Sequence, residues 1–272
     1  MPEGASDTAS ESTGQETPSR EELLRQMSFL EHLEDLRKRL ITSAVAVVVG
    51  FLACYGFHER IYGLMQRPVI QALHDNHMSE TLVFLNVLEP FNLYVKISAM
   101  VGIFVASPVI LYQLWLFISP GLYRHEKRYV GPFMFSTIAL FLAGGLFGYK
   151  VAFPAALHFL LGYSKQFMPM LTIKEYTDLF LTIVLGLGAI FEMPILVFFL
   201  ALMGIVSSKW MVENFRYAIL VIFIIAAIVA PADVWSMCIF AAPMVALYIL
   251  SIGVVWLLER ARRNREREAA KA

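Results

Sequence analysis

Six apolar segments alternate with polar ones along the chain, and their lengths predict the fold. About 20 apolar residues suffice for a helix to cross the hydrocarbon core of a membrane. Only helices and closed barrels satisfy their backbone hydrogen bonds there. We therefore expect an all-α, polytopic membrane protein with six transmembrane helices, of which the fifth and sixth are short. The predicted spans are residues 41–57, 93–117, 130–149, 179–203, 217–230 and 234–258.

The polar segments divide the chain into three parts. Residues 1–18 are small, polar and acidic, which predicts a disordered tail. Residues 19–258 form the membrane domain, which begins with a predicted amphipathic helix that lies on the membrane and leads into the first span. Residues 259–272 form a basic cytoplasmic tail. On the outer side we expect short surface helices within residues 58–92 and a loop over residues 150–177.

The distribution of charge predicts the orientation of the spans. The 272 residues are 58% hydrophobic and 16% charged, with a mean hydropathy of +0.64 and a formal net charge of zero. Sixteen of the 22 Lys and Arg residues lie on one side of the predicted spans and five on the other, while Lys96 lies near the outer start of the second span. Because positive residues accumulate on the cytoplasmic side, we expect both termini in the cytoplasm.

The loop after the second span contains the first candidate site. Residues 117–129 read FISPGLYRHEKRY, so a Pro-Gly turn and several cations surround a single carboxylate, Glu126. A functional interpretation has Glu126 bind a cationic partner. The alternative is a solvated residue paired with Arg124 or Arg128, which is the usual state of such a charge.

Two acids before the first span form a second candidate. Glu34 precedes Lys38 by four residues, and Asp35 precedes Arg39 by four, which is the favourable orientation for ion pairs along a helix. The alternative to a binding role is that these acids only stabilise their own helix.

Glu192 is the one carboxylate deep inside a predicted span. An ionisable group at that depth costs at least about 2.5 kcal/mol, so it should face protein or water and serve a function. The alternative is a neutral acid hydrogen-bonded to a backbone carbonyl that Pro194 leaves free. Spans two, four and six each contain a proline, Pro108, Pro194 and Pro243, and kinks there would form a concave wall.

The sequence has no constellation typical of an enzyme. It contains neither a Gly-rich phosphate loop nor a nucleophile elbow, and its six histidines lack metal-ligand spacing. Both cysteines, Cys54 and Cys238, fall in apolar segments. We therefore expect no enzymatic activity, no cofactor, no metal and no nucleic acid.

Several motifs together resemble one family. Residues 106–115 (ASPVILYQLW), followed by Phe117, PGLY at residues 120–123 and His125-Glu126, are similar to the TatC family, the multi-spanning core subunit of the twin-arginine protein translocase. Three further stretches, HLEDLRKR at residues 32–39, FEMP at residues 191–194 and PAD at residues 231–233, resemble the same family in the same order. The resemblance covers residues 28–258.

The resemblance implies a receptor and scaffold in a bacterial cytoplasmic membrane. Such a protein binds paired-arginine signal peptides of folded precursors on the cytoplasmic face, and the proton-motive force drives export. A planar guanidinium fits a carboxylate bidentately, so two arginines call for two acids. The signal-peptide site implied by the family comprises Glu126, Asp35, Glu34, Arg37, Phe117 and Arg124, with Asp35 standing where the family usually has Glu.

The resemblance also implies TatA-like and TatB-like single-span partners, a homo-oligomer and contact with the lipid bilayer. The family's partners dock along the last two spans, where this chain has Met237 and Ile249 in place of a usual Gln and Glu. We therefore expect docking chiefly by packing, with one polar link. The predicted docking residues are Asp233, Met237, Phe240, Met244 and Ile249.

Two other functions compete with this one. A proton-coupled carrier of small solutes would use Glu192 as a relay, but such carriers more often show repeated halves, and this sequence has no internal repeat. A purely structural membrane anchor would tolerate Glu126→Ala without loss of export.

Overall fold

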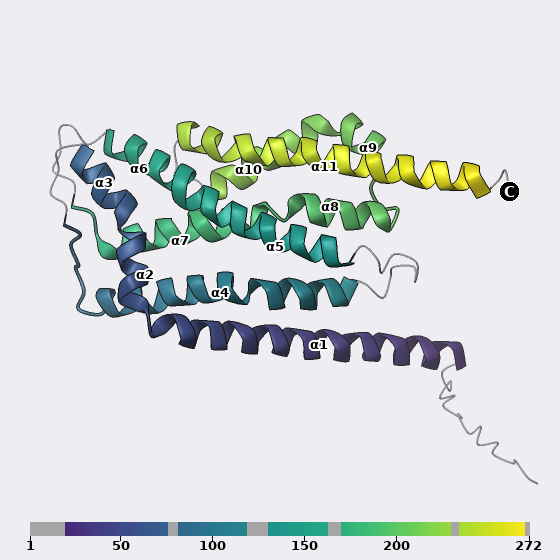
Figure 1. The fold of residues 1–272 in the computed structure, drawn as a ribbon, viewed down its shortest axis with the longest axis horizontal. Helices are drawn as coiled ribbons and strands as arrows, with labels where there is room; N and C mark the ends of the chain where they lie inside the picture. Colours follow the sequence, from purple (N-terminus) through teal and green to yellow (C-terminus); the bar gives the residue numbers. More distant parts are fainter. Residues whose placement is uncertain (1–19, 76–80, 119–129, 163–169, 230–233, 270–272) are drawn as a thin grey trace, which may run out of the picture.

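The computed structural model describes residues 20–75, 81–118, 130–162, 170–229 and 234–269, and this part of the chain is almost entirely helical (Figure 1). A single parallel β-bridge joins Val83 to Thr172. The helices are α1 (Arg20–Tyr55), α2 (His58–Met65), α3 (Arg67–Asp75), α4 (Glu89–Ile118), α5 (Val130–Phe147), the π-helical turn η3 (Gly148–Ala152), α6 (Phe153–Gly162), α7 (Ile173–Ile190), α8 (Met193–Leu202), α9 (Ser208–Glu213), α10 (Phe215–Val229) and α11 (Val234–Ala269).

Five stretches of this fold are long and apolar enough to cross a membrane, and α10 is a shorter apolar helix. The predicted short fifth span is confirmed, since the 15 residues of α10 rise about 22 Å. The predicted short sixth helix is wrong, because α11 has 36 residues. No Gly or Pro follows Gly253 before Ala269, so nothing ends the helix where the apolar run stops. The five long stretches are Leu33–Tyr55, Glu89–Phe117, Met134–Gly162, Ile173–Leu202 and Val234–Ala261.

The amphipathic segment before the first span is not a separate helix on the membrane surface. It is collinear with the span in α1, which runs without interruption for 36 residues, about 54 Å (Figure 1). Residues 20–49 contain neither Gly nor Pro, so the backbone has no position at which to turn. The predicted tail of residues 1–18 lies outside the described residues.

The segments that were predicted to lie on the outer side are more helical than expected. The short helices expected after the first span are confirmed as α2 and α3. The loop predicted over residues 150–177 is largely wrong, because the third span continues through η3 into α6 and α7 already begins at Ile173. Thr172 marks that start, since its side chain accepts a hydrogen bond from the Glu175 amide at 3.2 Å.

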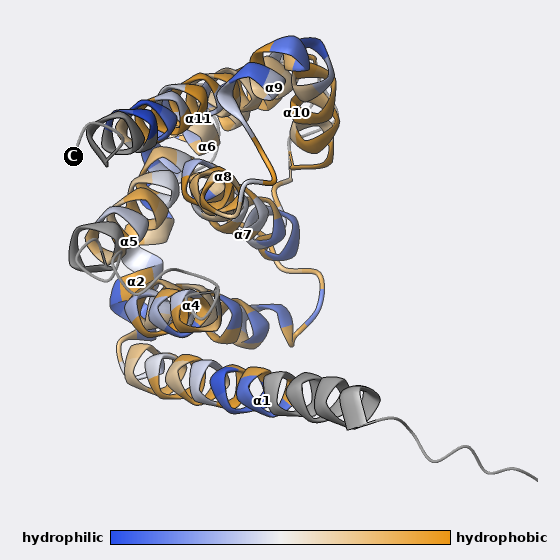
Figure 2. Ribbon diagram, turned by 90° about the vertical axis from the view of Figure 1, so that its right-hand side faces the viewer, coloured by the Kyte–Doolittle hydropathy of each residue, from blue (hydrophilic) through white to orange (hydrophobic). Residues whose placement is uncertain are grey.

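The helices form an open arc in the view of Figure 2. α1 and α4 form one end, α10 and α11 form the other, and α5, α7 and α8 lie between them. Among the described residues of the long helices, α1 packs chiefly against α4, whereas α7 packs against both α4 and α5. The tightest part of the core surrounds Phe153, Tyr176 and Phe180, whose rings meet edge to face or stacked at centroid distances of 5.0 to 6.3 Å.

Only one of the three prolines coincides with a broken helix. α4 continues past Pro108 and α11 past Pro243. The fourth span is interrupted at Phe191 and Glu192, and Pro194 lies in the first turn of α8, where a missing N–H costs no hydrogen bond.

Candidate functional site

A close crossing of two glycines sets how α1 and α4 lie against each other. A Cβ atom at Gly50 would come 2.7 Å from the Gly102 carbonyl oxygen, so the two backbones touch at this point. Asp35 precedes Gly50 by 15 residues and Phe117 follows Gly102 by 15 residues. The helices run in opposite directions, so both residues lie about 22 Å from the crossing toward the same end. The structure thus brings Asp35 and Phe117 to one level.

The charged end of α1 forms the two ion pairs that its sequence predicts. The Arg39 Nε atom donates to Asp35 Oδ2 at 2.7 Å, and Lys38 Nζ lies 2.8 Å from Glu34 Oε1. Both acids therefore already have a cation of their own helix, as the structural alternative expected.

Two further members of the predicted site lie at the same end. Arg37 is exposed, and it has no ion pair within the part of the chain that the structure describes. Phe117 is half-buried at the end of α4. Glu126 and Arg124 lie outside the described residues, but residues 119–129 are attached to the last residue of α4 and the first residue of α5, Ile118 and Val130.

Glu192 lies at the joint between α7 and α8. It is half-buried, and its Oε1 atom is buried without a hydrogen-bond partner among the described residues. The preceding Phe191 packs tightly against α5, because a Cβ atom at Gly144 would come 2.8 Å from the Phe191 Cβ atom. The joint therefore holds the Glu192 carboxyl group within the helix bundle. The sequence-based alternative paired this group with a backbone carbonyl that Pro194 leaves free, but Oε1 makes no such hydrogen bond among the described residues.

The predicted docking residues lie on different faces of α11. Met237 is half-buried, and Phe240 and Met244 are each only 1% exposed because α11 packs against α8 and α10. A partner could not reach Phe240 or Met244 without opening this core. The structure therefore does not support the prediction that these two side chains contact a partner directly. Ile249, by contrast, is 54% exposed. Asp233 lies outside the described residues.

The buried and exposed faces of α11 follow the helical period. The buried positions of α11 recur every three or four residues, at Phe240, Met244, Tyr248, Ser251 and Val255. The sequence prediction combined residues from both faces. The exposed apolar positions that it missed on α10 and α11 include Ile224, Ile228, Trp235 and Leu250.

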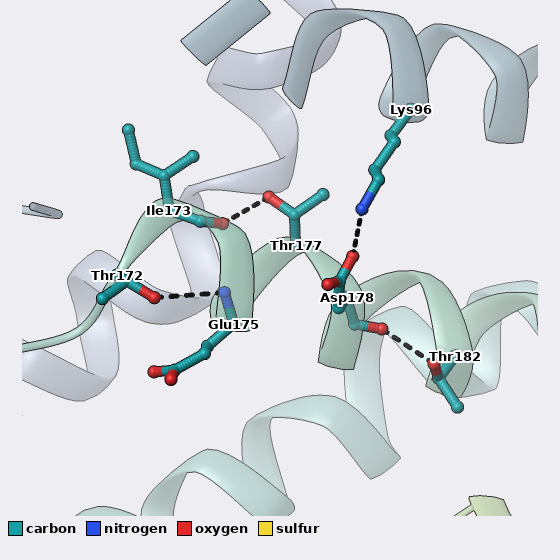
Figure 3. A network of polar contacts seen from close by, with 7 residues as sticks. All are labelled: Lys96, Thr172, Ile173, Glu175, Thr177, Asp178 and Thr182. Carbon is teal, nitrogen blue, oxygen red and sulfur yellow. Dashed lines mark hydrogen bonds and ion pairs between the residues drawn. The ribbon is translucent and has the colours of Figure 1, made fainter. Parts of the chain in front are cut away.

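An ion pair that was not predicted from the sequence joins two spans at the other end of the molecule. Lys96 on α4 reaches Asp178 on α7, as Figure 3 shows. The Asp178 carbonyl in turn accepts a hydrogen bond from the Thr182 hydroxyl at 2.8 Å. The available signal was a Lys and an Asp of opposite charge near the ends of two apolar helices, because charged groups in a membrane protein pair with one another.

A second polar link joins α9 to α11. Glu259 accepts hydrogen bonds from the Ser208 amide at 2.9 Å and from the Ser208 hydroxyl at 2.6 Å. The buried Tyr248 hydroxyl donates to the Met211 carbonyl at 3.0 Å. No cluster of three or more metal-binding side chains occurs in the described ranges.

Comparison with known proteins identifies the family. The family model "Sec-independent protein translocase protein (TatC)" matches residues 31–243. A curated relative of that name from Koribacter versatilis is 62% identical over 253 residues, 93% of each chain. Another from Desulforapulum autotrophicum is 39% identical over 256 residues, 93% of this chain and 92% of its own.

Solved structures agree with this assignment. A crystal structure of the twin-arginine translocase receptor TatC superimposes with a TM-score of 0.73 at 37% identity, and it covers 83% of this chain and 98% of its own. A second structure of that receptor has a TM-score of 0.75 at 36% identity, covering 82% and 99%. The chain belongs to the TatC family and is a non-enzymatic membrane component of the Sec-independent protein translocase.

Proposed function

We propose that this protein is the receptor for twin-arginine signal peptides, with its binding site at the end of the α1–α4 pair. The observation that carries the proposal is the helix register, in which Asp35 and Phe117 lie at one level where residues 119–129 are attached. Glu126 on that segment and Asp35 on α1 supply two carboxylates for two guanidinium groups. Glu34, Arg37 and Arg124 contribute to the same surface, and Phe117 offers an apolar contact.

The ion pairs within α1 are weak enough for a signal-peptide arginine to replace the cation of one of them. An ion pair near the surface is worth about 0.2–1 kcal/mol, so an incoming guanidinium can replace Arg39 on Asp35 at small cost. A bidentate guanidinium–carboxylate pair is stronger than the single contact that it replaces. Lys38 and Arg39 thus hold the two acids of α1 in place until a signal peptide binds.

The charge distribution supports an orientation of the protein in its membrane. We propose a multi-pass protein of the bacterial cytoplasmic membrane whose two termini, with α9, face the cytoplasm. Sixteen of the 22 Lys and Arg residues lie on that side. This places the signal-peptide site where folded precursors carrying an uncleaved signal peptide are found.

The test is site-specific photocrosslinking of a twin-arginine precursor to this protein in native membranes. We expect crosslinks from position 117 and from positions within residues 119–129. Glu126→Gln should abolish them, because it removes a charged bidentate acceptor while changing little packing. Asp35→Glu should be tolerated, since it keeps the carboxylate.

The matched control for Glu126→Gln is Glu59→Gln, an exposed acid on α2 at the opposite end of the spans. Its crosslinks should equal those of the unchanged protein. Undiminished precursor binding by Glu126→Gln would overturn the receptor proposal and favour the structural-anchor alternative. The carrier alternative is set aside, because the family is that of a protein translocase.

We further propose that TatA-like and TatB-like single-span partners dock along α10 and the exposed face of α11, and that the receptor assembles as a homo-oligomer. Ile249 and Ile228 offer exposed apolar contacts there, at 54% and 75% exposure. Disulfide mapping from cysteines at positions 228 and 249 to a partner helix tests the docking. A cysteine at the buried position 240 is the matched control. Crosslinks confined to another helix would refute this face.

A further inference from the structure

Two tryptophans of α11 mark the thickness of the membrane. Trp235 and Trp256 are 21 residues apart, which corresponds to about 31 Å along a helix and matches the hydrocarbon core of a bilayer. Both are exposed, at 61% and 45%. Tryptophan is enriched at the two membrane–water interfaces. Trp256 therefore lies at the boundary on the side of α9, since the sequence of α11 changes from apolar to charged three residues later, at Glu259. Figure 2 shows the same change along α11, which turns from apolar to polar in colour toward its C-terminal end.

An open hollow of about 460 Å³ lies at this boundary, between α9 and α11. One part of its wall is apolar and belongs to α11, and the other part is polar and belongs to α9. Nothing comes within 4 Å of a Cβ atom built at Gly253, so the missing side chain leaves this part of the wall open. The lining residues are Ser208, Lys209, Val212, Glu213, Ile252, Gly253 and Trp256.

One cation, Lys209, lines the polar edge of the hollow, and a second, Arg260, contacts the lining residue Trp256. The Arg260 guanidinium lies over the Trp256 ring, 5.3 Å from its centroid, and the Lys209 side chain is 85% exposed. Two acids are nearby, but each has partners of its own. Glu213 lies 3.8 Å from Lys209, and Glu259 is bound by Ser208 and contacts Arg263 at 4.0 Å. The same helix continues with Arg262, Arg265 and Arg267 in its sequence.

We propose that this hollow is a binding site for an anionic phospholipid. The lipid phosphate would lie between Lys209 and Arg260, and one acyl chain would follow Ile252 and Gly253 toward the membrane centre. The charge of the edge and the apolar wall below it match the two halves of such a lipid. Basic pockets between transmembrane helices are suited to acidic headgroups. A neutral lipid would fill the apolar wall but gain nothing from the cations.

The test uses the full-length protein, purified in mild detergent and examined by native mass spectrometry with added lipid. We expect phosphatidylglycerol to be retained in preference to phosphatidylcholine. Lys209→Gln and Arg260→Gln should each lower phosphatidylglycerol retention about fivefold, in line with the attraction of one cation near an acidic surface. Gly253→Leu should lower it as well, because the new side chain fills the acyl wall while every charge remains.

Lys174→Gln is the matched control for the charge variants, because Lys174 is an exposed cation in the first turn of α7, and α7 contributes no residue to the hollow. It should leave lipid retention unchanged. A photoactivatable phosphatidylglycerol should also label residues of α9 and α11, and inorganic phosphate should not displace it. Equal retention of both lipids, or loss in Lys174→Gln equal to that in Lys209→Gln, would mean unspecific attraction and overturn the site. Undiminished retention by Gly253→Leu would show that no acyl chain occupies the hollow.

Discussion

Gly102 allows α1 and α4 to touch backbone to backbone. A Cβ atom there would lie 2.7 Å from the Phe51 amide nitrogen and 2.9 Å from the Phe51 Cα atom. These are backbone atoms and cannot rotate away, so a larger residue has to push α1 outward.

We predict that Gly102→Leu destabilises the protein by about 1–3 kcal/mol, the usual cost of overpacking. It should also weaken precursor crosslinking, because α1 carries Asp35 away from Phe117 when it is pushed outward. Thermal unfolding in mild detergent measures the first effect. Gly63→Leu is the control, since nothing lies within 4 Å of a Cβ atom at that position. Equal melting of Gly102→Leu and the unchanged protein would refute the close crossing.

Glu192 offers a second prediction at the scale of one residue. Glu192→Gln keeps size and hydrogen-bonding capacity, so folding and most transport should survive. Glu192→Leu removes the buried carboxyl group and with it any polar contact that this group makes during transport. A polar contact between membrane helices is worth about 1–2 kcal/mol, which corresponds to a loss of about five- to thirtyfold in the step that depends on it. Transport into inverted vesicles, with precursor binding measured separately, should locate the defect after binding. An inactive Gln variant beside an active Leu variant would show that shape rather than polarity matters.

At the scale of elements, two tyrosines attach α2 to the rest of the fold. The buried Tyr176 hydroxyl donates to the Met65 carbonyl at 2.6 Å, and the exposed Tyr149 hydroxyl donates to the Leu64 carbonyl at 2.8 Å. The two bonds end on consecutive carbonyls at the same helix end, so they differ chiefly in burial.

We predict that Tyr176→Phe lowers the free energy of unfolding by about 1–3 kcal/mol, because a buried carbonyl loses its donor. Amide hydrogen exchange in α2 and α3 should accelerate in this variant. Tyr149→Phe should cost less, since water can replace the lost donor at the surface. The same shift for both variants would mean that burial does not govern these bonds.

At the scale of the whole molecule, the orientation can be measured with two exposed positions. In a background with Cys54→Ala and Cys238→Ala, a cysteine at Leu85 should react with a membrane-impermeant thiol reagent on intact cells. Leu85 is 79% exposed and lies between α3 and α4. A cysteine at Asn264, near the end of α11, should react only after permeabilisation. The reverse labelling would contradict the positive-inside assignment.

Local features of this chain could be predicted because their causes are local. The apolar runs set the number of spans, since hydrocarbon admits only segments whose backbone bonds are internal. The pairs Glu34–Lys38 and Asp35–Arg39 form because positions four apart face each other on any helix. The family motifs sufficed to identify the chain as a translocase component, and the structure agrees.

The sequence by itself therefore determined the apolar helices, their order and the family. Only the tertiary structure decided which face of each helix is buried, as Phe240 and Met244 on α11 demonstrate. Lipid and protein interior are equally apolar, so hydropathy cannot distinguish a core-facing residue from a lipid-facing one. The register of Asp35 with Phe117 also came from the structure, because it depends on where two glycines of separate helices meet.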